Sequence, residues 1–490
     1  MDHFKEPMTR LERRVNLTLA HVFALRMLGF FIVLPVLAEH ARLLPGGQSG
    51  LLVGLAMGAA GLSQACLQIP MGWASDRFGR RRVIALGLAC VLVGSLVCAY
   101  ASEVQTLIAG RILQGCGAVS AAISALVADH TRENQRTKAM ALVGMGIGLS
   151  FTVSLALAPW LYAHAAMAGI FLLTAFLALA SIGLVATVPA VAPGAGSGPG
   201  AAVGRGAAPS PGAAVAPGGA LGPGRALAPG EGLGPGRALA PGEGLGPGKV
   251  PLLASLRSVG QDPRLWRLDL GIFVLNAVQM AMFVVVPGYI VRSIGLPLAE
   301  HWRLYLPIVL VSFALALPLL RRAESRSALG GLMRTAVWVL LAVQLGWMVL
   351  MQLGGDVAAN GGALAGDVAG PGSAPSWLIL PAAITLLAFF VAFNVLEAAL
   401  PAQVSRAAAS TQRGTAMGVF NTAQSLGLFT GGALGGLLGA RLDSAGVFLC
   451  CGALLAALLF AIGKQGFSTP GYQARSALPE ASSPGVAGST

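Results

Sequence analysis

The sequence predicts an all-α integral membrane protein, with twelve transmembrane helices arranged as two six-helix bundles. Of its 490 residues, 55% are apolar and only 10% are charged, whereas about a quarter of an ordinary soluble domain is charged. So few charges cannot cover a soluble globule, which excludes a soluble enzyme. The long apolar runs exclude collagen-like and wholly disordered chains. These runs recur from end to end of the sequence, and most charges lie between them.

Each apolar run is long enough to cross a bilayer, because about 20 helical residues span its hydrocarbon core. A backbone in lipid must satisfy its own hydrogen bonds, so helices are expected rather than the alternating segments of a β-barrel. The spacings Gly54-xxx-Gly58 and Gly431-xxx-Gly435-xxx-Gly439 indicate faces for close helix packing. The predicted spans are 16–38, 49–73, 83–101, 104–128, 138–160, 166–189, 268–292, 302–320, 329–352, 376–400, 414–437 and 445–463.

Lysine and arginine residues set the expected orientation. Twelve spans place both ends of the chain on one side, and 25 of the 32 Lys and Arg residues fall in segments on that side. The opposite loops contain 4, and the remaining 3 lie within spans. Leaving out the long 190–267 segment, which has little weight in orientation, still gives 18 against 4. Both termini are therefore predicted to be cytoplasmic, and the net charge of +13 reflects topology rather than nucleic-acid binding.

The chain divides into two halves joined by a long segment rich in Gly, Pro and Ala. This segment repeats a twelve-residue unit, first at 222–233 and again at 234–245. Pro and Gly at this density favour flexible coil. Short similar strings open the fifth and eleventh spans, and two repeated helical bundles are typical of alternating-access carriers. The predicted parts are a cytoplasmic tail at 1–15, a six-helix bundle at 16–189, a disordered cytoplasmic linker at 190–267, a second six-helix bundle at 268–463 and a cytoplasmic tail at 464–490.

A motif of glycines, one aspartate and several arginines lies between the second and third spans. Gly72 would allow close helix approach, and Gly79 would allow a turn with positive φ. Asp76 could cap a helix end or face the positive N-terminus of another helix. The arginines supply charge that neither loses its proton nor enters lipid. The motif reads Gly72-Trp-Ala-Ser-Asp76-Arg77-Phe-Gly79-Arg80-Arg81-Arg82, a spacing more specific than a plain positive loop.

The fourth span contains Arg111, followed by Gln114 and Gly115. Arg111 lies about two turns into the membrane, where a charged side chain costs about 2.5 kcal/mol or more unless it faces protein or a wet cavity. Two interpretations are open. Arg111 either snorkels toward the outer surface or lines the central cavity as a fixed cation that acts on a proton-carrying group.

Other polar side chains inside the spans are candidates for binding a proton or a substrate. Arg26 lies near the membrane midplane, and His21, one turn before it, titrates near neutral pH or packs between helices. Glu397 is the only carboxylate well inside a span. It could carry a proton or pair with a basic residue at the cytoplasmic mouth. Four amides could hydrogen-bond a substrate or join helices: Asn276, Gln279, Asn394 and Gln424.

These motifs resemble those of the major facilitator family of transporters. The loop motif fits the family pattern GxxxD(R/K)xGRR(R/K) in every specified position, and Arg111-xx-Gln114-Gly115 is similar to the fourth-helix motif. The first span resembles the drug:proton antiporter branch, and strings such as 25–29 and 414–419 resemble the YajR-type transporters. The resemblance covers nearly all of 10–465 except the linker. It implies the two-bundle fold and a proton gradient as the energy source, with no cofactor.

The resemblance also implies that the loop motif acts as a conformational latch. Asp76 would face the N-terminus of the eleventh span near Gly414, and Arg80 would pair with Asp129 at the cytoplasmic end of the fourth span. The latch would hold the outward-facing state until proton or substrate binding releases it. The fifth span departs from the antiporter pattern, since it ends in Ala158-Pro159 where antiporters often have Gly-Pro.

The function that the sequence favours is secondary active transport, with proton-coupled efflux of a small lipophilic molecule by alternating access. A uniporter or symporter on the same fold, an integral membrane enzyme and a non-transporting sensor are the alternatives. No catalytic or metal site is predicted, because the six histidines and six cysteines show no metal-ligand spacing. The expected partners are a small-molecule substrate, protons and the lipid bilayer of a bacterial inner membrane, with no nucleic acid and a monomeric state.

Overall fold

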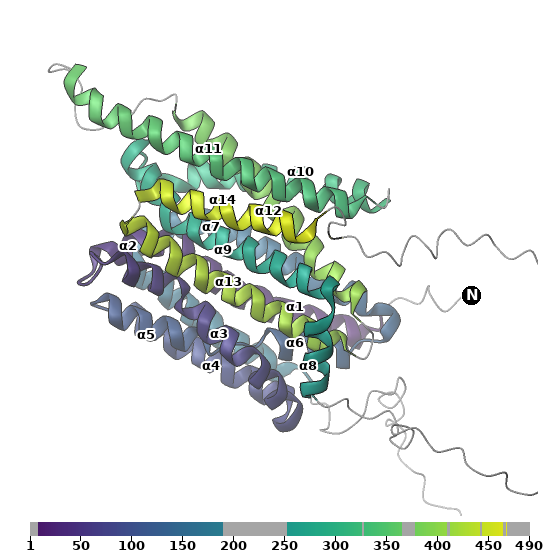
Figure 1. Cartoon of the computed structure of the whole chain (residues 1–490). Helices are drawn as coiled ribbons and strands as arrows, with labels where there is room; N and C mark the ends of the chain where they lie inside the picture. The colour runs from purple at the N-terminus through teal and green to yellow at the C-terminus, as the bar shows by residue number, and fades with distance from the viewer. Residues whose placement is uncertain are drawn as a thin grey trace, which may run out of the picture.

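A computed structural model describes residues 8–189, 252–325, 328–364, 378–408, 412–441, 443–463 and 467. Every regular element in these ranges is helical, and most helices run side by side in one bundle (Figure 1). The helices are α1 (Arg10–Phe31), α2 (Leu34–Leu43), α3 (Gly50–Phe78), α4 (Arg80–Ala99), α5 (Val104–Gly115), α6 (Ser120–Asp129), α7 (Glu133–Thr187), α8 (Leu252–Gln261), α9 (Pro263–Ser293), η1 (Leu298–Glu300), α10 (His301–Ser325), α11 (Leu329–Leu364), α12 (Ile379–Ala407), α13 (Arg413–Arg441) and α14 (Asp443–Ile462).

The first and fourth predicted spans are each interrupted by a short break. The first divides into α1 and α2 just before Pro35, whose ring nitrogen cannot donate the hydrogen bond that would continue the helix. The fourth divides into α5 and α6 between Gly115 and Ser120, where Gly117 also lies. Backbone carbonyls at such breaks are free to accept bonds from side chains, as Gly117 O does.

The fifth and sixth predicted spans appear as one element, α7, which contains a sharp kink. Ala166 has φ 51° and ψ −166°, so α7 consists of two helices joined at this residue. Its 55 residues would measure about 80 Å if straight, at 1.5 Å per residue, far more than a bilayer core. The expected loop at 161–165 is therefore helical up to the kink, although the two crossings are retained.

Ten described segments are long and apolar enough to cross a membrane. One of them, Gly146–Thr187, covers both crossings of α7, and α13 is not among the ten. Glycine, threonine and amide side chains lower the hydropathy of α13, which nevertheless packs along α3 and α9. Counting α7 twice and including α13 gives the twelve crossings that the sequence predicts.

The predicted linker needs a correction at its C-terminal end. Residues 190–251 lie outside the described residues, but α8 and the first turn of α9 fall within the predicted 190–267. The physical reason is compositional, because the Gly and Pro repeats stop near 251 and a leucine-rich amphipathic stretch follows. Val259 of α8 is buried, and α8 contacts α9 and α13 while lying across the bundle end (Figure 1).

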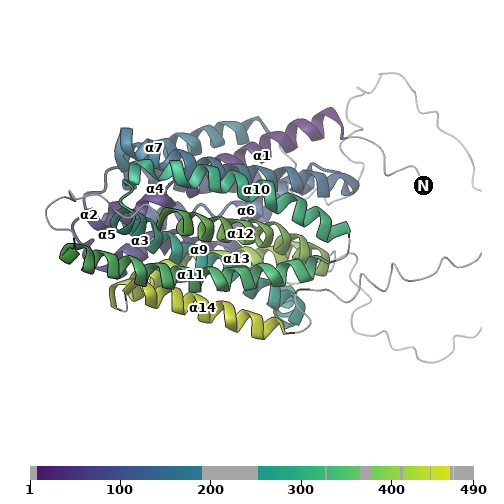
Figure 2. The same cartoon turned by 90° about the horizontal axis from the view of Figure 1, so that it is seen from above.

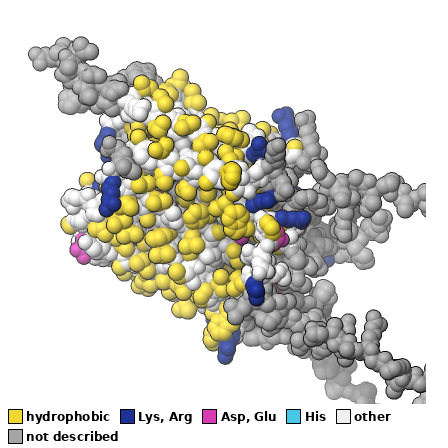
Figure 3. Space-filling model, in the orientation of Figure 1, with side chains coloured by type: hydrophobic (Ala, Val, Ile, Leu, Met, Phe, Trp, Pro, Cys, Tyr) yellow, Lys and Arg dark blue, Asp and Glu magenta, His cyan; other side chains and the backbone are white. Residues whose placement is uncertain are grey.

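Two opposite faces of the bundle contain the helix ends. The tail face is where α1 and α9 begin and α3 and α6 end; the far face is where α2 ends and α3 begins. Seen from above, α9, α12 and α13 lie between α7 on one side of the bundle and α14 on the other (Figure 2). Hydrophobic side chains cover the middle of the surface, and Lys and Arg lie toward the two ends (Figure 3). This distribution is that of a protein whose middle is embedded in lipid.

Candidate functional site

The loop motif occupies the turn between α3 and α4 at the tail face. Gly79 separates the two helices with φ 96°, a conformation that favours glycine and that the sequence predicted. The predicted ion pair is present, with Arg80 Nε 2.6 Å from Asp129 Oδ2. Arg81 Nη2 donates a hydrogen bond to Ala186 O at 2.7 Å. The motif thus links α4 to the ends of α6 and α7, all within the N-terminal half.

The other arginines of the motif lie at the surface. The Arg77 guanidinium lies 5.5 Å from the centre of the Trp73 ring, and Arg82 is exposed. The side chain of Asp76 is not among those described. Its predicted position opposite the start of α13, near Gly414, therefore lies outside the described residues and stays a prediction.

The two motif glycines differ in how closely they are packed. A Cβ added at Gly72 would lie 3.9 Å from Ala121 Cβ, which is ordinary contact, so the predicted close helix approach at Gly72 is wrong. A methyl group therefore fits at this position, and the glycine is not required for clearance. A Cβ added at Gly115 would instead collide with Ala60 O. Close approach of α5 to α3 therefore depends on the glycine of the fourth-helix motif.

Arg111 is buried between helices and does not reach the surface. Its side chain is 1% exposed. Nε donates to Ala56 O at 3.3 Å, Nη2 to Met57 O at 3.4 Å and Nη1 to Gln114 Oε1 at 2.8 Å. Gln114 Nε2 then donates to Ser95 Oγ at 2.8 Å. The snorkelling interpretation is wrong, because protein oxygens replace water around the guanidinium and tie α5 to α3 and α4.

Arg26 of α1 lies in the same buried region. It is 6% exposed, and its Nη2 donates to Gln64 Oε1 at 3.0 Å and to Gly117 O at 3.3 Å. Its Nε is buried without a hydrogen-bond partner. The guanidinium carbons of Arg26 and Arg111 lie 5.5 and 5.7 Å from the centre of the Phe30 ring. The fold thus gathers two arginines, distant in sequence, around one aromatic side chain.

Glu397 is the centre of a second polar cluster, in the C-terminal half. Gln424 Nε2 of α13 donates to Glu397 Oε1 of α12 at 2.8 Å, and Asn276 of α9 approaches the same carboxylate. Glu397 Oε2 is buried without a hydrogen-bond partner. Three predicted residues from three helices therefore meet. Among the described side chains, none of the salt bridges involves Glu397, so its alternative role as the partner of a basic residue has no support there.

The remaining candidates lie apart from this cluster. Asn394 Nδ2 donates to Ser312 Oγ at 2.9 Å, which joins α12 to α10. His21 is exposed, and its Nδ1 lies 2.7 Å from Leu17 O of its own helix. Gln279 lines a small pocket with apolar neighbours from α9, α10 and α12. This pocket is bounded by Gln279, Met282, Phe283, Val286, Tyr305, Leu386, Phe389 and Phe390.

Five phenylalanines, which sequence reasoning missed, form an aromatic row that connects the two halves. Ring centres are 5.6 Å apart for Phe30 and Phe31 and 5.1 Å apart for Phe31 and Phe151 of α7. Phe151 then lies 6.0 Å from Phe390 and 5.7 Å from Phe393 of α12. The sequence shows only that Phe390 and Phe393 share one helix face. Their pairing with the first half depends on the fold.

The structure also reveals a second carboxylate, partly buried, that the sequence analysis passed over. Asp269 lies about two turns into α9 and is partly exposed, yet its Oδ1 is buried without a hydrogen-bond partner. The predicted seventh span begins at 268, so the sequence placed this residue at a membrane boundary. Helix α9 begins earlier, at Pro263, which moves Asp269 inside the helix.

The two halves meet closely along a glycine seam near the far face. The seam consists of Gly50, Gly54 and Gly58 of α3 against Gly432 and Gly436 of α13. A Cβ added at any of the five would come within 3.0 Å of the opposite backbone, so the helices approach backbone to backbone. The predicted packing face at 54–58 is confirmed. Of the predicted face at 431–439, Gly431 and Gly435 pack closely on α9, but a Cβ added at Gly439 would meet only Val447 Cγ2 at 3.8 Å, so close packing there is wrong.

An ion pair supports the closure beside this seam. Arg42 Nη1 lies 2.5 Å from Glu39 Oε1 within α2, and Arg42 Nη2 donates to Val284 O of α9 at 3.2 Å. A Cβ added at Gly288 would come within 3.0 Å of both side chains and of Arg292. Charged groups from both halves therefore converge on a glycine at the far face.

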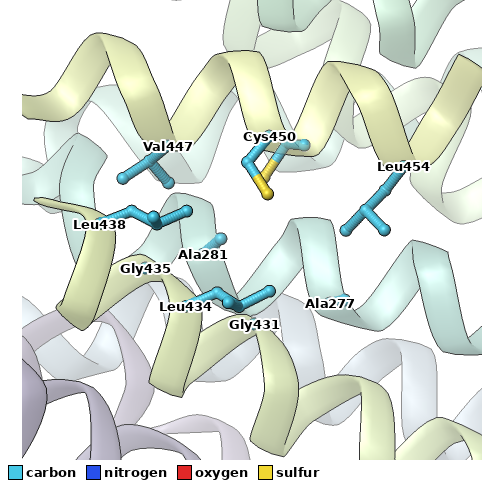
Figure 4. Close-up of a pocket in the computed structure, with 10 residues that line it drawn as sticks. Ala277, Ala281, Gly431, Leu434, Gly435, Leu438, Val447, Cys450 and Leu454 are labelled. Atoms are coloured by element: carbon cyan, nitrogen blue, oxygen red, sulfur yellow. The ribbon is translucent and has the colours of Figure 1, made fainter. Parts of the chain in front are cut away.

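A second small pocket lies between α9, α13 and α14. Its lining is apolar, with Ala277 and Ala281 facing Gly431 and the side chain of Cys450 (Figure 4). Figure 4 shows the α14 side chains pointing toward the two other helices. A pocket without polar side chains cannot orient a polar ligand, so we assign it to packing between helices.

Comparisons with known proteins agree with this architecture. The Major Facilitator Superfamily model matches residues 18–366. The chain is 33% identical over 452 residues to the inner membrane transport protein YajR of Escherichia coli K12, covering 92% of this chain and 83% of that protein. It is 28% identical over 425 residues to an uncharacterized transporter of Buchnera aphidicola from Acyrthosiphon pisum, covering 86% and 90%.

A solved structure of similar fold is a mutant of the nucleoside transporter NupG. It aligns with a TM-score of 0.58 at 11% identity, covering 91% of this chain and 98% of that one, and therefore supports the fold alone. The family model spans well over half of the sequence. The chain therefore belongs to the Major Facilitator Superfamily, as a multi-pass membrane protein that transports rather than an enzyme.

Proposed function

We propose that this transporter exports a small lipophilic molecule in exchange for protons, with its tail face in the cytoplasm. Glu397 is the observation on which the proposal depends. Its carboxylate lies inside a membrane helix with amide neighbours in place of a cation, and its Oε2 has no hydrogen-bond partner. Such a group can gain and lose a proton without breaking an ion pair. Ionisable groups inside membrane helices commonly belong to proton relays.

The proposed orientation is supported by the distribution of charge. Most Lys and Arg residues, including the arginines of the loop motif, lie in segments at the tail face. The far-face loops contain only 4 Lys and Arg residues. Positively charged loops are retained in the cytoplasm during insertion. In this orientation Glu397 lies on the cytoplasmic side of the membrane midplane, since α12 ends at Ala407 on the tail face.

The proposed substrate class is supported by apolar surfaces in the interior. The pocket beside Gln279 is lined mainly by Met, Phe, Val and Leu side chains, and it borders the aromatic row at Phe390. Binding sites for small molecules are typically apolar with a few polar groups that fix orientation. Gln279 supplies such a group here, because its Nε2 is buried without a hydrogen-bond partner.

Alternating access needs a closure at each face that can be released. The glycine seam and Arg42 join the two halves near the far face, and we propose that these contacts form its closure. The Arg80–Asp129 pair lies within one half, so it cannot by itself hold the two halves together. We propose that it fixes the loop motif so that Asp76 can reach the N-terminus of α13, where a carboxylate is favoured by the helix dipole.

Transport in proteoliposomes with an imposed pH gradient tests this function. Glu397→Gln removes the titratable group but keeps its size and its bond to Gln424, so we expect substrate movement that no longer responds to the gradient. Glu300→Gln, at the exposed far-face loop, is the matched control and should respond as wild type does. Proton movement through Glu397→Gln at the wild-type rate would refute the proposal.

The direction of proton movement separates the proposal from its nearest alternative. Antiport predicts that added substrate and protons move in opposite directions, whereas a symporter moves them together and a uniporter moves no protons. A pH-sensitive dye trapped in the proteoliposomes measures this directly. Movement of protons in the same direction as the substrate would indicate symport, rather than antiport, on the same fold.

A further inference from the structure

Two buried arginines of the N-terminal half form no salt bridge with any carboxylate among the described side chains. Arg26 is 6% exposed and Arg111 1% exposed, and both guanidinium groups lie within 6 Å of the Phe30 ring centre. All acidic residues of 8–189 lie at or near helix ends, away from this region: Glu12, Glu39, Asp76, Glu103, Asp129 and Glu133. Two like charges in a membrane interior are costly without an anion nearby.

The hydrogen bonds of the two arginines differ in completeness. Arg111 has oxygen acceptors for Nε, Nη1 and Nη2, from Ala56, Met57 and Gln114. Arg26 has acceptors for Nη2 alone among the bonds described, and its Nε is buried without one. These acceptors are carbonyl and amide oxygens. Such oxygens solvate a cation but do not cancel its charge, so the region as a whole keeps a positive field.

The aromatic row begins beside the arginines and is buried between the helices, with Phe151 4% and Phe390 1% exposed. Phe30 contacts both guanidinium groups and starts the aromatic row, which passes through Phe151 to Phe390 in the other half. Flat apolar groups stack on phenylalanine rings at such spacings. A molecule with an anionic end and an aromatic body would match both parts at once.

We propose that Arg26 and Arg111 bind the anionic group of the transported molecule, whose aromatic body lies along the aromatic row. The substrate class is thus an amphiphilic organic anion, such as an aromatic carboxylate or sulfonate. Arg26 Nε donates to the anion, and Arg111, held by α3 and Gln114, contributes its field. This inference rests on the proposed transport function and names the substrate class of the same site.

Binding to the purified full-length protein tests the charge preference. Three probes share a naphthalene ring and differ in charge: 1-naphthaleneacetate, neutral 1-naphthaleneacetamide and the cation 1-naphthylmethylammonium. We expect the anion to bind at least about tenfold more tightly than the other two, which corresponds to about 1.4 kcal/mol. Arg26→Gln should remove this preference, and Arg26→Lys should keep most of it. Arg334→Gln, which changes an exposed arginine of α11, is the matched control and should bind as wild type.

Several outcomes would overturn the inference. Equal binding of the three probes, or an unchanged anion preference in Arg26→Gln, would show that the arginines do not select an anionic ligand. Binding of chloride alone, with no naphthalene probe competing, would indicate an inorganic counter-ion. If the wild type does not bind the anion but Glu397→Gln does, the countercharge of the arginines is Glu397 in another conformation. Size-exclusion profiles and helical circular dichroism establish that each variant is folded.

The transport assay distinguishes this failure from failure of the proposed function. Proteoliposomes with a pH gradient are loaded with each naphthalene probe in turn. Gradient-driven movement of the cationic or neutral probe alone would leave proton-coupled transport standing and overturn the anion site. If the anionic probe still moves but no movement depends on the pH gradient, the anion site stands and proton-coupled transport is overturned.

Discussion

The Arg80–Asp129 ion pair is only partly buried, with side chains 23% and 30% exposed. Water therefore weakens it, and its coupling free energy should be about 1 kcal/mol or less. We predict this value from a double-mutant cycle of Arg80→Ala and Asp129→Ala, read from thermal unfolding in detergent. A coupling of several kcal/mol would mean that the pair bridges more structure than α4 and α6.

Asp76 should matter far more for transport than for stability. Because its proposed partner is the N-terminus of a helix in the other half, Asp76→Asn should abolish transport and leave expression intact. Ser75→Ala is a matched control, since the Ser75 hydroxyl donates to Gly72 O of its own helix. Transport rates measured side by side in proteoliposomes provide the comparison. Wild-type transport by Asp76→Asn would refute the latch.

Sequence reasoning at the residue scale succeeded where spacing is specific. The turn at Gly79 was predicted from the motif itself, whereas the Arg80–Asp129 pair was implied by the family resemblance. The burial of Arg111 was left open, since one sequence cannot show which face of a helix meets protein. The hydrogen bond from Arg26 to Gly117 O was missed because it depends on the break between α5 and α6.

At the scale of elements, the glycine seam predicts where a single methyl group is tolerated. A Cβ added at Gly54 would come within 2.9 Å of Gly436 Cα. Gly54→Ala should therefore cost about 1–3 kcal/mol through overpacking. Gly183→Ala on α7 meets nothing within 4 Å and should gain up to about 1 kcal/mol in helix propensity. Melting temperatures of the two variants in the same detergent compare them, and equal values would contradict the seam.

Element boundaries were predicted less well than element existence. Pro35 marked a possible kink, but the sequence did not reveal the kink at Ala166 or the helix α8. Apolar content shows that a segment lies in the membrane, but it does not report how neighbouring helices bend it. Ala166, with φ 51°, has no sequence signature because a non-glycine residue in that conformation is held by its surroundings.

For the whole molecule, the proposed orientation can be measured by labelling. In a variant whose native cysteines are replaced by alanine, Ser482→Cys in the C-terminal tail should react with a membrane-impermeant maleimide only after lysis. Glu103→Cys, in the far-face loop before α5, should react in intact cells. Reaction of Ser482→Cys in intact cells would invert the assignment of the two faces.

The twelve-crossing fold was predictable because its signal is carried by whole segments. Hydropathy over about 20 residues averages out local errors, and the charge asymmetry adds an independent constraint. The relation between the two halves was not predictable in the same way. It depends on glycine and phenylalanine contacts such as Gly54 with Gly432 and Phe151 with Phe390, which join residues hundreds of positions apart.

The glycine seam has a thermodynamic consequence for the exchange between conformations. Because Gly54 and Gly436 meet through backbone, opening the far face there exposes little hydrocarbon. Heat capacity rises with the apolar area that becomes hydrated. The transition should therefore have a small heat-capacity change, and the ratio of the two conformations should vary almost linearly with inverse temperature on a van't Hoff plot. A transporter sealed by interlocking leucines would show marked curvature instead.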